Sequence, residues 1–383
     1  MTRLRDELRL LAAEAPQVDL AERAVRGARR QKTTTFASVV AALAALAVSA
    51  AILVDGSRGA TTSTQVTDVL PASGVDPAAY AYYDFCGRKW DYRKNTHTFA
   101  GQNCAQWQLV TRTGQRFRVP EATSVYTEQT ADNYMNTGAP LVITPDGRRI
   151  AYYSEKDRTF AVRDLAGGQI WLAPLTVTRQ AMVRSGVLLT LSPDGRYLGV
   201  NGPDRLDAVV DVETGQLTEP PNGWRVRRVA SGGTSVVMSD LADGLGLMSD
   251  GKVTPLTIGK PWDDITVPAP DEHTMAYLDG RKDDGNGMFS PDNAVATLDA
   301  TTGKTLTKVT FRDAPKDFTP RLGGWLSPTE VAVSDAARGP RSEDGTPMLG
   351  EVVYGIDVNT GKVRERAKYT YRGWAGDLSI PGF

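Results

Sequence analysis

The sequence predicts an all-β fold, a β-propeller with six blades, preceded by one transmembrane helix and a short N-terminal helical tail. Three observations lead to this prediction. Two phrases rich in turn residues recur along residues 80–383, no apolar period of 3.6 residues is sustained there, and residues 36–54 contain no charge, proline or glycine. Repeated short strands indicate propeller blades, and a long uncharged apolar run indicates a membrane helix.

The composition narrows the classes of function. The 383 residues include 44 Lys and Arg against 45 Asp and Glu, so the net charge of −1 offers no general attraction for nucleic acid. The chain has two histidines and two cysteines, too few for the common zinc sites and iron–sulfur clusters. We therefore expect no nucleic-acid partner, no metal site and no cofactor.

Residues 1–35 are expected to form a basic helical tail in the cytoplasm. They contain eight basic and five acidic residues. Leu4, Leu8 and Leu11 fall on one face of a short helix that Pro16 ends. We interpret this face as part of an amphipathic helix on anionic lipid; the alternative is a docking surface for a cytoplasmic partner.

Residues 36–54 are expected to cross the membrane as a single helix. Such a helix would extend about 28 Å, close to the ~30 Å thickness of the hydrocarbon core. The basic residues before it favour a cytoplasmic N-terminus and an external C-terminal part. The alternatives are a buried soluble helix and a signal peptide cleaved near Val48-Ser49-Ala50; the second also leaves the rest of the chain extracytoplasmic.

Residues 55–79 are rich in Gly, Ser, Thr and Pro and have few bulky apolar side chains. This composition is typical of a flexible tether. The predicted organisation is a cytoplasmic tail at 1–35, a transmembrane helix at 36–54, a tether at 55–79 and an extracytoplasmic propeller at 80–383. The predicted location is therefore the cell membrane, with the lipid bilayer as one partner.

The first repeated phrase is a turn that opens a strand. It reads TPDGRR at residues 144–149 and SPDGR at 192–196, with degenerate copies at 269–273 and 326–330. Pro presets φ in such a turn, Asp caps it and Gly takes the position with positive φ. The short β-branched runs near these turns predict strands.

The second phrase is a strand, a tight turn and another strand, as in AVVDVETGQLTE at residues 208–219. The turn glycines of this series are Gly114, Gly168, Gly215, Gly251, Gly303 and Gly361, spaced 36 to 58 residues apart. Six hairpin turns predict six blades of about 51 residues each, with insertions at 279–293 and 336–350. A count of seven blades, with about 43 residues each, stays open.

These phrases resemble the TolB-like and WD-repeat-like propellers of bacterial envelope proteins. The resemblance rests on SPDGR before a short strand and on the D-x-x-T-G turn, and it covers residues 80–383. The chain departs from the eukaryotic WD-repeat pattern, because Gly-His and Trp-Asp do not recur and Trp262-Asp263 stands alone. The whole arrangement resembles single-pass membrane proteins of high-GC Gram-positive bacteria, some of which are encoded beside sigma factors. This resemblance implies a fold and almost nothing about function.

The sequence contains no catalytic motif. No G-x-S-x-G occurs, and His97 and His273 stand in no catalytic pattern. Residues 283–287, DDGNG, have oxygen ligands and glycines but lack the spacing and the closing Glu of a calcium loop. We interpret them as a solvated turn, and we expect no catalytic residues and no enzymatic activity.

Two clusters of side chains are candidates for binding. Arg225, Arg227 and Arg228 lie on one predicted strand after Trp224; they fit either an anionic ligand surface or, as we prefer, the solvated face of an outer blade strand. A group of aromatic residues fits either packing between blades, which is the default, or a surface for a glycan or peptide. This group contains Tyr80, Tyr82, Tyr83, Phe85, Trp90, Tyr92 and Trp107.

Cys86 and Cys104 are expected to form a disulfide. They are the two cysteines of the chain and stand eighteen positions apart in the first predicted blade. In an oxidising compartment an isolated pair of this kind normally becomes a bridge. Two separate buried thiols are the alternative.

The predicted function is that of a non-enzymatic binding or scaffolding module. A propeller anchored in the membrane would bind an unknown protein, peptide or glycan with the loops of one rim or the mouth of its central channel. The alternative is a transmembrane sensor whose cytoplasmic tail binds a partner such as a sigma factor. In that case Leu4, Leu8 and Leu11 would form the contact surface of the tail.

Overall fold

The computed structural model describes residues 68–84, 89–91, 96–98, 106–123, 139–178, 181–182, 187–202, 206–240, 244–256, 265–279, 293–316, 318–341, 347–372 and 378–383. All of them belong to a compact unit that spans Thr62–Phe383. Among these residues no helix is long and apolar enough to cross a membrane. The tail at 1–35 and the membrane helix predicted at 36–54 lie outside the described residues.

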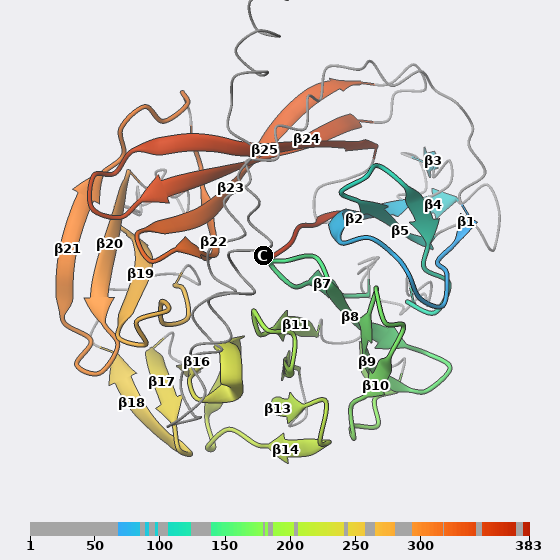
Figure 1. Ribbon diagram of the computed structural model, residues 1–383, viewed down its shortest axis with the longest axis horizontal. Helices are drawn as coiled ribbons and strands as arrows, with labels where there is room; N and C mark the ends of the chain where they lie inside the picture. The colour runs from blue at the N-terminus through green and yellow to red at the C-terminus, as the bar shows by residue number, and fades with distance from the viewer. Residues whose placement is uncertain are drawn as a thin grey trace, which may run out of the picture. The chain divides into compact units, whose positions relative to one another are not determined.

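The chain folds into six blades arranged around one centre (Figure 1). From the centre outward, blade 2 contains β7 (Leu141–Ile143), β8 (Arg149–Ser154), β9 (Thr159–Asp164) and β10 (Ile170–Leu172). Blade 3 contains β11 (Leu188–Leu191), β12 (Tyr197–Asn201), β13 (Ala208–Asp211) and β14 (Gln216–Thr218). Blade 4 contains β15 (Trp224–Val229), β16 (Val236–Asp240), β17 (Leu245–Ser249) and β18 (Lys252–Leu256).

Blades 5 and 6 differ in their inner strands. Blade 5 contains β19 (Thr274–Asp279), β20 (Ala294–Asp299) and β21 (Thr305–Thr310). On its inner side a single bridge from Ile265 to Tyr277 stands in the position of a fourth strand. Blade 6 contains β22 (Arg321–Ser327), β23 (Glu330–Arg341), β24 (Pro347–Asp357) and β25 (Val363–Arg372). The prediction of an all-β propeller with six blades is therefore confirmed, and the alternative of seven blades is wrong.

Blade 1 joins the two ends of the described chain and closes the ring. Its strand order is β1 (Asp68–Val69), β6 (Arg116–Arg118), β5 (Gln106–Thr111), β2 (Ala78–Asp84) and β26 (Leu378–Ser379). The C-terminal strand β26 pairs with β2 through Ala81 and Ser379. Next to this closure the ring of Tyr80 in β2 packs against that of Tyr369 in β25, with centroids 5.2 Å apart.

Both repeated phrases form the turns that the sequence predicts. The first phrase connects the two inner strands of a blade, and the second connects the two outer strands. Because neighbouring strands in a blade are antiparallel, both kinds of turn lie on one face of the propeller, which we call the turn face. The opposite face, where the inner strands begin, is the loop face. All six glycines of the second phrase have positive φ, between 68° and 84°.

The turn chemistry repeats from blade to blade. Ser192 Oγ donates to Asp194, whose carboxylate accepts the backbone N–H of Arg196. Thr144, Asp146 and Arg148 make the same bonds one blade earlier. In the outer turns, the Asp that precedes the Gly by four residues accepts backbone N–H groups two and three positions later, as at Asp211, Asp299 and Asp357. These bonds hold each turn in one conformation.

Two predicted boundaries differ from the structure. Residues 68–79 were expected in the tether, but β1 pairs in parallel with β6, and Leu70, Val75 and Ala78 are buried in the core. The described propeller thus begins at Asp68. Residues 336–350 were expected as an insertion, but β23 and β24 continue as a paired hairpin through most of this range, from Ala336 opposite Glu351 to Arg341 opposite Pro347.

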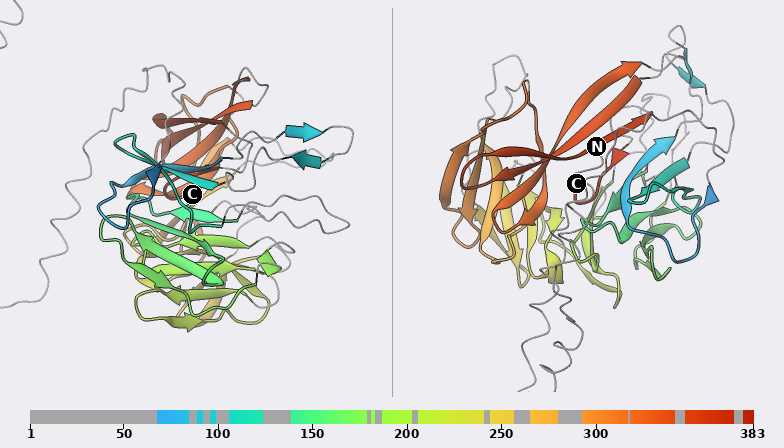
Figure 2. Two further views of the ribbon diagram at one scale, coloured as in Figure 1. Left: turned by 90° about the vertical axis from the view of Figure 1, so that its right-hand side faces the viewer. Right: turned by 45° about the horizontal axis from the view of Figure 1, so that its top comes forward.

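Two small elements complete the described fold. The strands β3 (Lys89–Asp91) and β4 (Thr96–Thr98) pair with each other between β2 and β5 in the sequence, and they stand away from the ring (Figure 2). A 3-10 turn, η1 (Ser231–Gly233), connects β15 to β16 on the turn face of blade 4. It occupies the position that the first phrase has in other blades.

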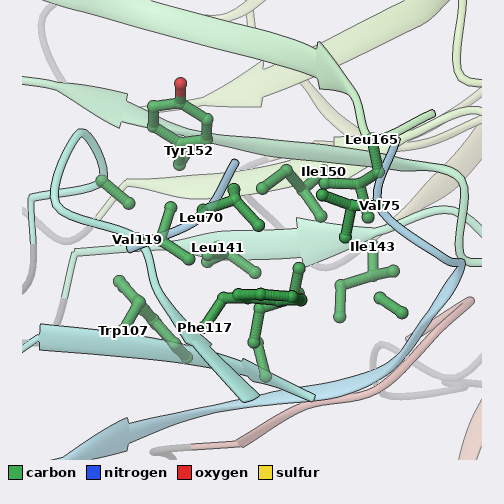
Figure 3. Packing of buried hydrophobic residues seen from close by; sticks show 14 of the residues in the cluster. Leu70, Val75, Trp107, Phe117, Val119, Leu141, Ile143, Ile150, Tyr152 and Leu165 are labelled. Atoms are coloured by element: carbon green, nitrogen blue, oxygen red, sulfur yellow. The ribbon is translucent and has the colours of Figure 1, made fainter. Parts of the chain in front are cut away.

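The core lies between neighbouring blades. Between blades 1 and 2 a buried cluster combines residues of both sheets with residues of the segment after β1, including Leu70, Trp107, Phe117, Ile150 and Leu165 (Figure 3). Full burial of one such aliphatic or aromatic side chain stabilises a fold by about 1.5–3 kcal/mol. Packing between the blades therefore holds each sheet in the ring.

Candidate functional site

A cavity of about 470 Å³ lies at the centre of the propeller. Its walls come from the innermost strands β7, β11, β15, β22 and β26, together with residues around Ile265 of blade 5. A cavity of this size falls within the range of small-molecule sites, about 300–1,000 Å³. The cavity is the candidate site because it is the place in the described fold where five blades and the inner segment of blade 5 meet.

One arc of the cavity wall is basic. Arg227 and Arg228 of β15 line it, and so does Arg321 of β22. The preferred interpretation of the arginine strand, a solvated outer strand, is therefore wrong, since β15 is the innermost strand of blade 4. In blades 2 and 3 a Pro-Asp-Gly turn after the innermost strand marks its position. The turn that follows β15 is η1, which lacks this motif, so the sequence alone did not identify β15 as an inner strand.

Each of these arginines is held by a defined bond. Arg227 Nε donates to Ser239 Oγ at 2.7 Å. Arg228 reaches across to blade 6, where its Nη2 donates to the backbone oxygen of Leu322 at 2.7 Å. It thereby links blade 4 to blade 6 past the short inner segment of blade 5.

Arg321 lies at the loop-face end of β22. Its Nη2 donates to Glu351 Oε1 at 2.7 Å, and Ser334 Oγ lies 3.4 Å away. The Arg321 side chain is 59% exposed and that of Glu351 is 10% exposed. An ion pair with one exposed partner leaves part of the guanidinium accessible to a ligand.

The other arc of the wall is apolar. It consists of β7 and β11, whose Leu141, Leu188, Leu189 and Leu191 line the cavity. Leu188 is 58% exposed at the loop-face end of β11, whereas its neighbour Leu189 is 9% exposed and belongs to the core. Leu188 is the most exposed large apolar side chain in the described part of the chain.

The segment after β26 enters the cavity and lines part of it. Gly382 donates its N–H to the backbone oxygen of Ile143 at 3.0 Å. The ring of Phe383 packs on Gly323 of β22 so closely that a Cβ at this glycine would lie 2.7 Å from Cε1. Figure 1 places this end of the chain at the centre of the ring. Leu188 and Arg321, which also line the cavity, are exposed at the loop-face ends of their strands.

Two polar side chains of blade 3, Asn201 and Asp207, lie near the basic strand. Asn201 Nδ2 donates to the backbone oxygen of Val226 at 2.9 Å. Burial raises the pKa of the neighbouring Asp207 carboxyl, while the charges of Arg225 and Arg227 act in the opposite direction. Asp207 is thus the acidic group whose charge partly balances that of β15.

Two members of the predicted aromatic cluster, Tyr83 and Trp107, belong to the core, and Tyr80 and Tyr82 are half-buried. Tyr83 and Trp107 are buried and meet edge to face at 5.6 Å, and Tyr80 packs on Tyr369 between blades 1 and 6. For Tyr80, Tyr83 and Trp107, the default interpretation, packing between blades, is therefore confirmed. Phe85 and Tyr92 lie outside the described residues.

Several predicted site residues lie outside the described part of the chain. These are Leu4, Leu8 and Leu11 of the tail, the pair Cys86 and Cys104, and the DDGNG segment at 283–287. His97 belongs to β4, whose backbone is described and whose side chains are not. His273 follows the turn that leads into β19, on the turn face and away from the cavity. Among the described residues, no group of three His, Cys, Asp or Glu is arranged to hold a metal ion.

No family model matches the chain, and no curated protein matches it. Similar solved structures include hydrazine synthase of Kuenenia stuttgartiensis, 15% identical, covering 62% of this chain and 69% of that one at a TM-score of 0.38. An oligogalacturonate lyase in complex with manganese is 13% identical, covering 65% and 75% at 0.39, and a nidogen/laminin complex is 11% identical, covering 79% and 97% at 0.40. Similarities of this strength carry no argument about function.

Proposed function

We propose that this protein is a non-enzymatic binding module that takes its ligand at the loop-face mouth of the central cavity. We further propose that a helix at residues 36–54 anchors it in the membrane, with the propeller outside the cytoplasm. The observation that carries the binding function is the contrast between the two ends of the cavity. Gly382 occupies the turn-face end, where it bonds to Ile143, whereas Leu188 and Arg321 are exposed at the loop-face end.

The residues of the cavity favour binding over catalysis. General acid–base catalysis relies on His, Asp, Glu, Lys, Tyr or Cys near the reacting atoms. The described lining residues include three arginines, one asparagine and many aliphatic side chains, but none of those six types. Such a lining can hold and orient a ligand.

The binding function is tested by site-specific photo-crosslinking in cells that produce the full chain. A photoreactive phenylalanine derivative replaces Leu188 on the loop face or, as a matched control, Leu326, which is 49% exposed at the end of β22 on the turn face. We expect discrete adducts from position 188 and none from 326. Adducts from 326 alone, or from neither position, would refute binding at the loop face.

The membrane anchor is supported by the uncharged run at 36–54 and the basic residues before it. Single cysteines placed at Thr33 and Gly59 test it in a chain whose natural cysteines are serine. We expect Gly59 to react with an impermeant reagent in intact cells, and Thr33 to react after permeabilisation. The reverse pattern, or a mature chain that begins near Ala51, contradicts the anchor.

The sensor remains the second candidate because Leu4, Leu8 and Leu11 share a helical face that an anchor does not need. Replacing all three by Ser tests it. A cytoplasmic protein that co-purifies with the natural chain and is lost from this variant, with membrane insertion intact, would favour the sensor. We expect no such protein.

A further inference from the structure

The open half of the central cavity has two chemically different sides. Arginines from β15 and β22 form one side, and leucines from β7 and β11 form the other. No acidic side chain belongs to the lining among the described residues. A ligand that fits both sides carries a negative charge at one end and an apolar group at the other.

The arginines are held in place before any ligand arrives. Ser239 Oγ fixes Arg227 at 2.7 Å, and Glu351 fixes Arg321 at 2.7 Å. Fixed guanidinium groups lose little side-chain entropy when they bind a carboxylate, and their planar shape matches two oxygens at once. The basic side is therefore arranged for an anion.

Two acids lower the positive charge near this side without removing it. Glu351 pairs with Arg321, and Asp207 stands near Arg225 and Arg227. Arg228 also lines the cavity, so the described lining has three arginines and no acidic side chain. An excess of positive charge in a partly enclosed cavity attracts anions more strongly than the same charge on an open surface.

The leucine side gives the apolar half of the ligand a place to bind. Leu188 exposes 58% of its surface there. Covering apolar surface contributes about 25 cal/mol per Å². A small inorganic anion would leave this surface wet, and an uncharged apolar molecule would remove water from the arginines without replacing its hydrogen bonds.

The residues after β26 indicate how wide a ligand the central cavity can hold. Residues 380–383 form a turn in which Phe383 N–H donates to the backbone oxygen of Ile380; Gly382 contacts Ile143 and Pro145, and the Phe383 ring packs on Gly323. The space between opposite inner strands is thus wide enough for a short chain with one apolar side group. The open half is bordered by strands of the same blades.

We infer that the open half of the cavity binds an organic carboxylate with an apolar tail, the carboxylate toward Arg227 and Arg321 and the tail toward Leu188. This inference rests on the proposed binding function and names the chemistry of its ligand. Such a carboxylate has two sources, the C-terminal residue of a peptide and a medium-chain fatty acid. Both present the same charged and apolar groups.

Calorimetry of the purified full chain tests this chemistry. The probes are N-acetyl-alanyl-leucine and octanoate, each compared with its uncharged amide. We expect at least one acid to bind at least tenfold more tightly than its amide, and the acid that binds more tightly identifies the source. Equal affinities of acid and amide, or no binding of either acid at millimolar concentration, would overturn the inference.

Three variants locate the site. Arg227→Gln removes one charge from the basic side, and Leu188→Asp places a negative charge on the exposed apolar side. Each should weaken binding of the acid at least tenfold, while Arg148→Gln, an exposed turn-face arginine, should leave it unchanged. Thermal melting confirms that each variant is folded, and Leu188→Asp keeps the test valid if Arg227→Gln unfolds.

The outcome is separable from that of the proposed function. Crosslinks from position 188 without binding of either acid would retain the binding module and refute the carboxylate ligand. Binding of an acid that Arg227→Gln and Leu188→Asp leave unchanged would also refute the inference, because the anion would then lie elsewhere.

Discussion

On the turn face the described blades use the same few residues, whereas the loop face differs from blade to blade. The turns at Asp146 and Asp194 share their hydrogen bonds, and so do those at Asp211, Asp299 and Asp357. The connection between the second and third strands, which belongs to the loop face, ranges from residues 155–158 in blade 2 to residues 85–105 in blade 1, which include β3 and β4. The regular face fixes the strands, and the irregular face is available for function.

The comparison also explains where the cavity is closed. Gly382 occupies the end that lies among the regular turns, beside Pro145. Arg321 and Leu188 stand at the other end, where sequence differences between blades give each inner strand its own side chains. Regular turns therefore build the scaffold, and the starts of the inner strands build the candidate site.

The largest expected effect concerns a turn-face glycine that another segment covers. Gly361 has φ of 70°, and a Cβ there would lie 2.0 Å from the backbone oxygen of Thr310. Gly361→Ala should lower the free energy of unfolding by about 3–5 kcal/mol, from left-handed strain and from overpacking together. Urea unfolding measures the change.

Gly215 provides the matched control for this prediction. It has the same place in its turn and φ of 73°, but no atom lies within 4 Å of a Cβ built there. Gly215→Ala should therefore lose only about 1 kcal/mol, the cost of the left-handed conformation. Equal losses at both positions would show that contact with the covering segment contributes nothing.

The next effect concerns the two cysteines, Cys86 and Cys104, which stand between β2 and β5 in the sequence. If they are bridged, Cys104→Ser or a reductant should lower the free energy of unfolding by about 3 kcal/mol, because the bridge restricts the unfolded chain. The variant should then be insensitive to reductant. Recovery of both cysteines as free thiols from unreduced protein, seen by mass spectrometry, would refute the bridge.

Much of the turn face could be predicted from the sequence. The Pro-Asp-Gly and Thr-Gly turns are local, so the residues that form them are neighbours in the chain. The turn at Ser231–Gly233 was missed because it lacks Pro and Asp, although Gly232 and Gly233 both have positive φ. Two adjacent glycines at the expected spacing were the signal that could have revealed it and placed β15 as an inner strand.

A moderate effect is expected at low pH from a turn-face ion pair. The Arg196 guanidinium donates to Asp211 and lowers the pKa of that carboxyl to about 2, below its usual value. The unfolded chain then binds a proton that the folded chain does not, between pH 4 and 2. The free energy of unfolding should therefore fall by about 1–2 kcal/mol as the pH drops through this range, less than the full shift because Arg196 is partly exposed.

This prediction is checked by urea unfolding between pH 7 and pH 2 for the natural chain and for Asp211→Asn. Hydrogen bonds in other turns also lower the pKa of Asp299 and Asp357, so the test is the difference between the two proteins. That difference should shrink as the pH falls below 4. A difference that stays constant with pH would show that Asp211 acts only through its shape.

The candidate site could not be predicted because its parts come from distant blades. Arg227, Arg321 and Leu188 lie far apart in the sequence, and only the ring closure by β26 brings their strands to one centre. The short β1 was missed for a related reason, since a strand of two residues in parallel pairing has no periodic signal. Local patterns thus indicated the blades, and the closed ring determined the cavity.

The smallest expected effect is that of Leu188→Ser, for which the adjacent Leu189 on β11 provides the comparison. Leu189 is 9% exposed and packs in the core between blades 2 and 3, so Leu189→Ser should cost about 2–4 kcal/mol of unfolding free energy. Leu188 is 58% exposed at the loop face, so Leu188→Ser should change it by less than about 0.5 kcal/mol. Both values come from urea unfolding. A large loss at Leu188 would mean that this side chain supports the fold, and its exposure would then give no reason to place a ligand beside it.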